Sequence, residues 1–191
     1  IGVVMMADQG REGLLSPFLR KQRFKAARPY LNGHVLDVGC GAGALAESVG
    51  SELYVGVDKD EEILKQARRD FPDHRFESTL PRSSEKFDTV AALAVIEHVP
   101  DPAAFLKELS QYLVDAPEAR IVITTPHSFI GWIHEIGATL GLFSKHASEE
   151  HEGLLNRKSL EKAGLEAGLE LVLYRRFLLA VNQIVVYKRA R

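Results

Sequence analysis

The sequence predicts an α/β fold in which a seven-stranded, mostly parallel sheet with one antiparallel strand carries helices on both faces. From His34 to Thr125, short apolar runs alternate with helix-like segments, which is typical of a parallel sheet. The last two strand-like runs, 169–177 and 182–188, are joined by only the short segment 178–181. Such a connection permits an antiparallel pair but no parallel crossover, so one of these strands is expected to be reversed.

The elements follow in order along the chain. The expected strands are 34–38, 53–57, 74–76, 87–93, 119–125, 169–177 and 182–188. The expected helices are 16–28, a helix that follows the glycines of 39–43 and runs to about 49, then 61–70, 102–113 and 157–167. Asp101 followed by Pro102 is typical of a helix N-cap and first position, and Gly168 is typical of a helix end.

The length of 191 residues predicts one domain, 1–191, with a substantial core. Residues 1–31 are expected to form an N-terminal arm and a basic helix, whose charges are either a solvated face or a cover for a ligand at the glycines. Residues 127–156 are too long for a simple connection and are expected to form a substrate lid, or else a helix packed in the core. A membrane-surface helix is a third reading of this segment.

Composition narrows the function classes. A net charge of −2 gives no indication of a nucleic-acid binder. The apolar opening, residues 1–7, is too short to span a membrane, so no stable membrane insertion is expected. The single cysteine, Cys40, has no internal disulfide partner, which favours a cytoplasmic location. The oligomeric state stays open.

The stretch from His34 to Ala46 contains the main functional motif. The apolar run with Asp37 in it leads into Gly39, Gly41 and Gly43, a pattern that predicts a buried strand, a tight turn and a helix N-terminus. Backbone N–H groups at such a turn face an approaching ligand. Glycine is required because a Cβ atom would forbid the turn or hold the ligand away.

The carboxylate of Asp37 indicates which ligand this is. The glycine spacing also satisfies a loose dinucleotide fingerprint, with Asp58 near the position of a ribose-binding acid. However, a carboxylate two residues before the first glycine would repel a pyrophosphate. S-adenosylmethionine carries no phosphate, so Asp37 can attract its ammonium group while loop N–H groups bind its carboxylate.

At this point the chain resembles the class I S-adenosylmethionine-dependent methyltransferases. The likeness rests on the segments 35–43, 55–58, 87–88 and 95–102, and it covers roughly residues 34–126. The small single-domain branch, methyltransferase type 11, which includes quinone-biosynthesis O-methyltransferases, is the most similar. The resemblance implies a Rossmann-like fold and S-adenosyl-L-methionine as cofactor, with S-adenosyl-L-homocysteine as product.

The resemblance also implies roles for individual residues. Asp37, Gly39 and Gly41 would hold the methionine end, with Cys40 as a small residue of the loop and Gly43 allowing close approach. Asp58 would bind the ribose hydroxyls, unless it is only a helix N-cap, and Lys59 would lie beside the adenine. Relatives carry an acid for the adenine amino group, and here Glu77, Ser78 or Thr79 would substitute. Leu93 and Ala94 would contact the methionine part, and His98 would lie near the sulfonium.

Three histidines are candidate bases, should the acceptor need to lose a proton. They are His98, His127 and His151, of which His98 is favoured because its motif ties it to the cofactor. No paired spacing of histidine or cysteine supports a metal site, and none is expected.

The expected function is therefore methyl transfer to a small-molecule acceptor, with oxygen as the expected methylated atom. Two other classes stay open: an NAD-binding oxidoreductase domain, and a non-catalytic partner subunit that binds S-adenosylmethionine.

Overall fold

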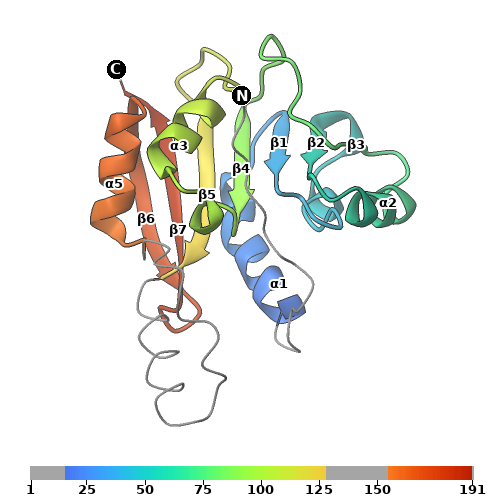
Figure 1. Ribbon diagram of the computed structural model, residues 1–191, viewed down its shortest axis with the longest axis horizontal. Helices are drawn as coiled ribbons and strands as arrows, with labels where there is room; N and C mark the ends of the chain where they lie inside the picture. Colours follow the sequence, from blue (N-terminus) through green and yellow to red (C-terminus); the bar gives the residue numbers. More distant parts are fainter. Residues whose placement is uncertain (1–15, 128–154, 191) are drawn as a thin grey trace.

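The computed structural model describes residues 16–127 and 155–190, so the arm at 8–15 and most of the expected lid lie outside the described residues. The described chain folds around a seven-stranded sheet of order β3-β2-β1-β4-β5-β7-β6 (Figure 1). The strands are β1 Val35–Val38, β2 Tyr54–Val57, β3 Arg75–Glu77, β4 Thr89–Leu93, β5 Arg120–Pro126, β6 Leu169–Phe177 and β7 Asn182–Arg189.

Strand directions confirm the predicted architecture. β3, β2, β1, β4 and β5 pair in parallel, whereas β7 is antiparallel to both β5 and β6. The chain runs outward from β1 to β3 and then returns to β4 on the other side of β1. The strand order thus reverses between β1 and β4, and in such sheets this crevice at the carboxyl ends of the strands is where ligands bind.

The helices begin where the sequence supplies caps. They are α1 Ser16–Ala27, α2 Glu61–Asp70, α3 Pro102–Ser110 and α5 Arg157–Glu166. The carboxylate of Asp60 caps α2 and that of Asp101 caps α3, while Asn156 and Ser159 form a reciprocal capping box at α5. α1 continues into the short 3₁₀ helix η1, Arg28–Tyr30.

The prediction of an α-helix directly after the glycines is wrong. The segment 41–45 forms turns, and only η2, Ala46–Ser48, is helical, as a single 3₁₀ turn. Gly43 is left-handed at φ 77°, and Gly50 is already extended at φ −58° and ψ 145°, so too few residues remain between them for an α-helix.

Two other boundaries differ from the prediction. β4 begins at Thr89 rather than 87, because Phe87 forms an isolated bridge to Leu113 instead of pairing with β1. α3 ends at Ser110, so Leu113 is buried after the helix rather than within it.

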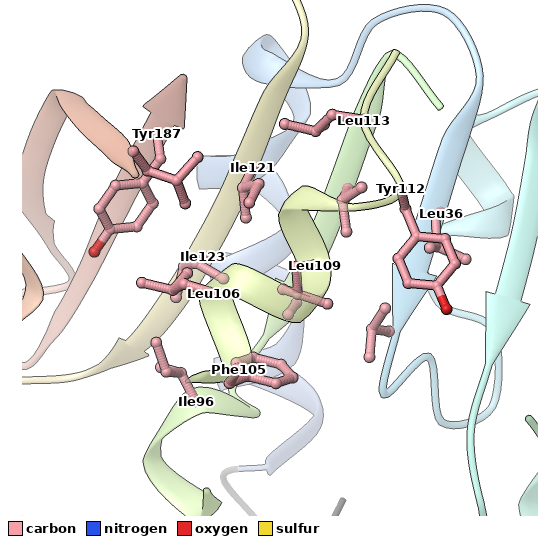
Figure 2. Packing of buried hydrophobic residues seen from close by; sticks show 14 of the residues in the cluster. Leu36, Ile96, Phe105, Leu106, Leu109, Tyr112, Leu113, Ile121, Ile123 and Tyr187 are labelled. Carbon is pink, nitrogen blue, oxygen red and sulfur yellow. The ribbon is translucent and has the colours of Figure 1, made fainter. Parts of the chain in front are cut away.

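Alternation along the strands divides the core between the two faces of the sheet. Leu36 and Val38 of β1 face the cluster formed with α3 and α5, and Figure 2 shows Phe105, Leu106 and Leu109 of α3 packed there. The remaining clusters contain Val35 with α2 and, further along the sheet, α1 with β5 and β7. Asp37 alternates with Leu36 and Val38, so it lies on the same face as Val35.

Gly164 of α5 tests this packing. Alanine in an exposed helix usually gains about 1 kcal/mol over glycine. Here an added Cβ would lie 2.6 Å from Cε1 of Tyr187, so we expect Gly164→Ala to lose about 1–3 kcal/mol of unfolding free energy in urea denaturation. Gly50→Ala is the matched control, because a Cβ there meets nothing within 4 Å. Equal stability of Gly164→Ala and the wild type would contradict the packing of α5 on β7.

Candidate functional site

A pocket of about 300 Å³ opens where the strand order reverses, at the carboxyl ends of β1 and β4. Four segments supply most of its wall: α1, the glycine loop, the end of β4 and the 3₁₀ helix η4, Ile96–His98. The lining residues from β1 and the glycine loop are Asp37, Gly39, Cys40, Gly41, Ala42, Ala44 and Leu45. The others are Arg20, Arg23, Phe24, Leu93, Ala94, Glu97, His98 and Pro126.

The glycine loop turns through three left-handed residues. Gly39, Gly41 and Gly43 have φ values of 75°, 53° and 77°, a region that residues with a Cβ rarely adopt. The N–H groups of Gly39 and Cys40 both donate to the carbonyl of Val57, at 2.8 and 3.0 Å. These two hydrogen bonds tie the loop to β2.

The N–H groups that remain for a ligand lie further along the loop. Within the part of the chain that the structure describes, those of Ala42, Ala44 and Leu45 make no hydrogen bond. All three residues line the pocket. The missing α-helix therefore leaves a short run of donors, comparable to the unsatisfied first turn of a helix.

Asp37 is almost fully buried, with 3% of its surface exposed, and it lines the pocket. The Tyr54 hydroxyl donates to its Oδ2 at 2.8 Å. Burial raises the pKa of Asp37 to about 7, and the negative charge of Asp58 adds to this shift while the Tyr54 hydrogen bond opposes it. Near neutral pH this carboxyl group therefore exists in both charge states.

Asp58 ends β2 and touches the loop from outside the pocket. Its Oδ2 accepts from the N–H of Gly41 at 2.9 Å, and its Oδ1 accepts from the N–H of Asp60 at 3.0 Å. The alternative role of Asp58 as the helix cap is wrong, because Asp60 caps α2. Lys59 is exposed and does not line the pocket.

Ser78 and Thr79 are exposed beyond the end of β3. They line a separate, open groove of about 740 Å³ together with Arg68 and Arg75 rather than the pocket. Gly43 also lies outside the pocket lining. A Cβ added there would lie 2.8 Å from Cζ of Phe76, so the close neighbour that requires a glycine at this position is the Phe76 ring.

The end of β4 brings Leu93 and Ala94 to the pocket, as the resemblance implied. Ala94 has φ 60°, a left-handed conformation that costs a residue with a side chain about 1–3 kcal/mol. Its N–H donates to the carbonyl of Thr124 at 2.8 Å, which holds this strained backbone against β5.

Glu97 and His98 of η4 both line the pocket. Within the described residues, Oε2 of Glu97 is buried without a hydrogen bond. Burial raises the pKa of Glu97, while the positive charges of His98 and Arg23 oppose that shift. The sequence had left Glu97 unassigned, and only its place directly before His98 could have pointed to it.

Of the other two candidate bases, the described one, His127, does not line the pocket. His127 is 8% exposed and its N–H donates to the carbonyl of Val181, one residue beyond the pocket-lining Pro126. Burial lowers the pKa of His127, and the positive charge of Arg176 adds to this. His151 lies outside the described residues.

The basic helix α1 supplies Arg20, Arg23 and Phe24 to the pocket. The sequence left two interpretations of this helix open, a solvated basic face or a cover for a ligand at the glycines. Its place at the pocket agrees with the second. Nε of Arg23 donates to Oδ1 of Asn182 at 3.1 Å, which fixes α1 to β7. Only the position of the helix just before β1 hinted at these contacts.

Two features are absent from residues 16–127 and 155–190. No group of three histidine, cysteine or acidic side chains there is placed to hold a metal ion. No helix in these ranges is long and apolar enough to cross a bilayer.

Replacing Asp37 tests its raised pKa. A carboxyl group whose pKa rises from 3.8 to about 7 on folding destabilises the fold increasingly as pH rises through that range. Without cofactor we therefore expect Asp37→Asn to be more stable than the wild type at pH 8, by at most about 4 kcal/mol at about 1.4 kcal/mol per pKa unit. The difference should shrink toward pH 4 in urea denaturation series. Exposed Asp73→Asn is the control; a pH-independent difference at Asp37 would contradict a raised pKa.

The comparisons with known proteins agree with this geometry. The family model of the methyltransferase domain matches residues 10–174. The ubiquinone biosynthesis O-methyltransferase of Neisseria meningitidis serogroup A is 32% identical over 116 residues, which cover 50% of this chain and 48% of that protein. The protein of the same name from Idiomarina loihiensis is 32% identical over 152 residues, covering 71% and 61%. The chain thus spans about half to three fifths of these curated relatives.

Solved structures share the fold at lower identity. The magnesium protoporphyrin IX methyltransferase of Synechocystis PCC 6803, solved with bound S-adenosylhomocysteine, has a TM-score of 0.68 at 18% identity, covering 95% of this chain and 90% of that one. An S-adenosylmethionine-dependent methyltransferase from Mesorhizobium loti has a TM-score of 0.63 at 19% identity, covering 86% and 96%. The chain belongs to the methyltransferase-domain family, which confirms its resemblance to the class I S-adenosylmethionine-dependent methyltransferases.

Proposed function

We propose that this protein is an S-adenosylmethionine-dependent methyltransferase that acts on a small-molecule acceptor, with oxygen as the methylated atom. The observation that carries the proposal is the buried Asp37 carboxylate, which lines a pocket beside three loop N–H groups without a hydrogen bond among the described residues. An anion and a row of donors side by side suit a group that bears both an ammonium and a carboxylate.

The same residues argue against a dinucleotide. A pyrophosphate at the loop would lie against the Asp37 carboxylate, with Asp58 also bonded to the loop at Gly41. Arg20 and Arg23 line the same pocket and would instead complement the carboxylate of the methionine end. The charge pattern therefore supports the methyl donor over the NAD alternative.

The nucleoside end would extend from the pocket toward β2 and β3. Asp58 uses one lone pair on each oxygen for backbone N–H groups, and a carboxylate has further lone pairs for ribose hydroxyls. Asp58 N–H donates to the carbonyl of Glu77, so the ends of β2 and β3 are adjacent. Lys59, Ser78 and Thr79 follow these two strands, and their role beside the adenine stays a prediction.

When bound, S-adenosylmethionine supplies a methyl group on a positively charged sulfur. The chain contributes position: Leu93 and Ala94 form the wall between the loop and η4, so an acceptor can be held in line with the donor. His98 is the candidate base for an acceptor hydroxyl, because of the described histidines it alone lines the pocket. Glu97 beside it is a second polar group for orienting that hydroxyl.

The names of the curated relatives, ubiquinone biosynthesis O-methyltransferases, support an oxygen acceptor. Whether a lid formed by 127–156 closes over it, and whether the protein is cytoplasmic, remain predictions from the sequence.

Isothermal titration tests the cofactor. We expect S-adenosylhomocysteine to bind, and Asp58→Ala to weaken it by about 10–100-fold, the loss typical of hydrogen bonds to a charged group. Asp60→Ala is the matched control, because the Asp60 carboxylate caps α2 and, unlike that of Asp58, accepts no hydrogen bond from the described residues of the glycine loop. Binding of NAD with no binding of S-adenosylhomocysteine would exclude the proposal.

Methyl transfer distinguishes an enzyme from a non-catalytic partner subunit. With radiolabelled S-adenosylmethionine and a panel of phenols and catechols, we expect transfer that falls by about 10²–10⁴-fold in His98→Ala, the usual contribution of a general base. The affinity of His98→Ala for S-adenosylhomocysteine should be measured alongside. A wild-type protein that binds cofactor but transfers nothing would favour the partner subunit.

A further inference from the structure

We propose that Tyr54 is a positioning residue of the cofactor site: its hydroxyl holds the Asp37 carboxylate in the orientation that an ammonium group requires. The inference rests on the proposed function and deepens it, since it concerns how the same site recognises its donor. Tyr54 itself does not line the pocket, so it would act only through Asp37.

The strand register explains how the two side chains meet. In the β1–β2 pair, Val35 lies opposite Tyr54 and Asp37 lies opposite Gly56. Tyr54 and Gly56 point to the same face as Asp37 because side chains alternate along a strand. The phenol therefore runs along β2, across Gly56, to reach a carboxylate on the neighbouring strand.

Gly56 provides the space for this contact. A Cβ at Gly56 would lie 2.8 Å from the Tyr54 hydroxyl oxygen and 2.7 Å from Cδ1 of Phe76. Any side chain there would push the hydroxyl away from Asp37. The absence of a side chain opposite Asp37 is thus part of the same arrangement.

Aromatic contacts fix the ring of Tyr54. It is 2% exposed and packs edge-on against His74 and Phe76, with centroids 5.5 and 5.6 Å away. Nε2 of His74 lies 2.9 Å from the carbonyl oxygen of Val49, which holds that ring in turn. Held in this way, the Tyr54 hydroxyl binds Oδ2 of Asp37 at 2.8 Å and restrains the carboxylate at the pocket wall.

The charged and titratable groups around Asp37 come from four elements. They are Cys40 on the loop, Tyr54 and Asp58 on and after β2, Arg20 and Arg23 on α1, and Glu97 and His98 on η4. Burial raises the pKa of Asp37, the Tyr54 hydrogen bond lowers it and the charge of Asp58 raises it, and together they bring it to about 7. Below neutral pH the free protein therefore holds a proton on Asp37, which a bound ammonium group displaces.

The test is isothermal titration of S-adenosylhomocysteine between pH 5.5 and 7.5, in two buffers of different ionisation enthalpy. This range lies below about 7.7–8.0, where a free α-amino group loses its proton. For the wild type we expect affinity to rise with pH, approaching tenfold per pH unit at the acid end, with release of nearly one proton at pH 6. For Tyr54→Phe we expect at least tenfold weaker binding at pH 6.5, and we expect the increase of affinity with pH to occur at higher pH than in the wild type.

Three variants serve as controls. Tyr187→Phe removes another buried phenol hydrogen bond, to the carbonyl of Leu160, far from the pocket lining, and should leave the titrations unchanged. Asp37→Asn should bind weakly and lose both the pH dependence and the proton release. Gly56→Ala should reproduce the displaced pH profile of Tyr54→Phe.

The outcomes separate the two proposals. A wild type that does not bind S-adenosylhomocysteine overturns the proposed function itself. If the wild type binds, two results for Tyr54→Phe overturn the role of Tyr54: an unchanged dependence of affinity on pH, or an equal loss of affinity at every pH. A structural defect alone would weaken binding without moving the pH dependence. Should Tyr54→Phe fail to fold, proton release that persists in Asp37→Asn overturns the inference equally well.

Discussion

A buried carboxylate is the constraint on which the arrangement of this protein depends. Asp37 lies on the central strand β1, between β2 and β4, where water cannot stabilise its charge. The fold supplies one hydrogen bond, from Tyr54, and leaves the carboxylate at the wall of a pocket. Because burial disfavours the charged form, the Asp37 carboxylate does not stabilise the fold near neutral pH. We therefore attribute its presence to the positively charged ligand group that it can attract.

The backbone around the pocket likewise leaves hydrogen-bond donors unsatisfied among the described residues and one residue strained, both of which lower stability. A regular helix after β1 would have satisfied more N–H groups within the chain. Instead, left-handed glycines turn the loop toward Val57 and Asp58, and the residues that carry the remaining donors line the pocket. The strained Ala94 faces them from the end of β4. Strain and unsatisfied donors at one place are typical of a site prepared for a ligand.

The sequence predicted what local patterns determine. Alternation of strands and helices, and the short connection at 178–181, were sufficient for the sheet and its reversed strand β7. Local patterns failed where two similar residues compete: Asp58 and Asp60 both precede α2, and only the folded backbone shows that Asp60 is the cap. They also failed at the glycine loop. Helix-favouring residues follow Gly43, but the segment between Gly43 and Gly50 is too short for an α-helix.

The individual residues that distant segments bring to the pocket could not be predicted. Arg20 and Arg23 reach the pocket because α1 packs on β5 and β7, two strands much further along the chain. This packing brings two arginines of α1 to the pocket that Asp37, Glu97 and His98 also line. A pocket with both signs of charge favours ligands that carry both, and excludes those with several negative charges. In the proposed function, the loop and α1 would together select the donor, and η4 would recognise the acceptor.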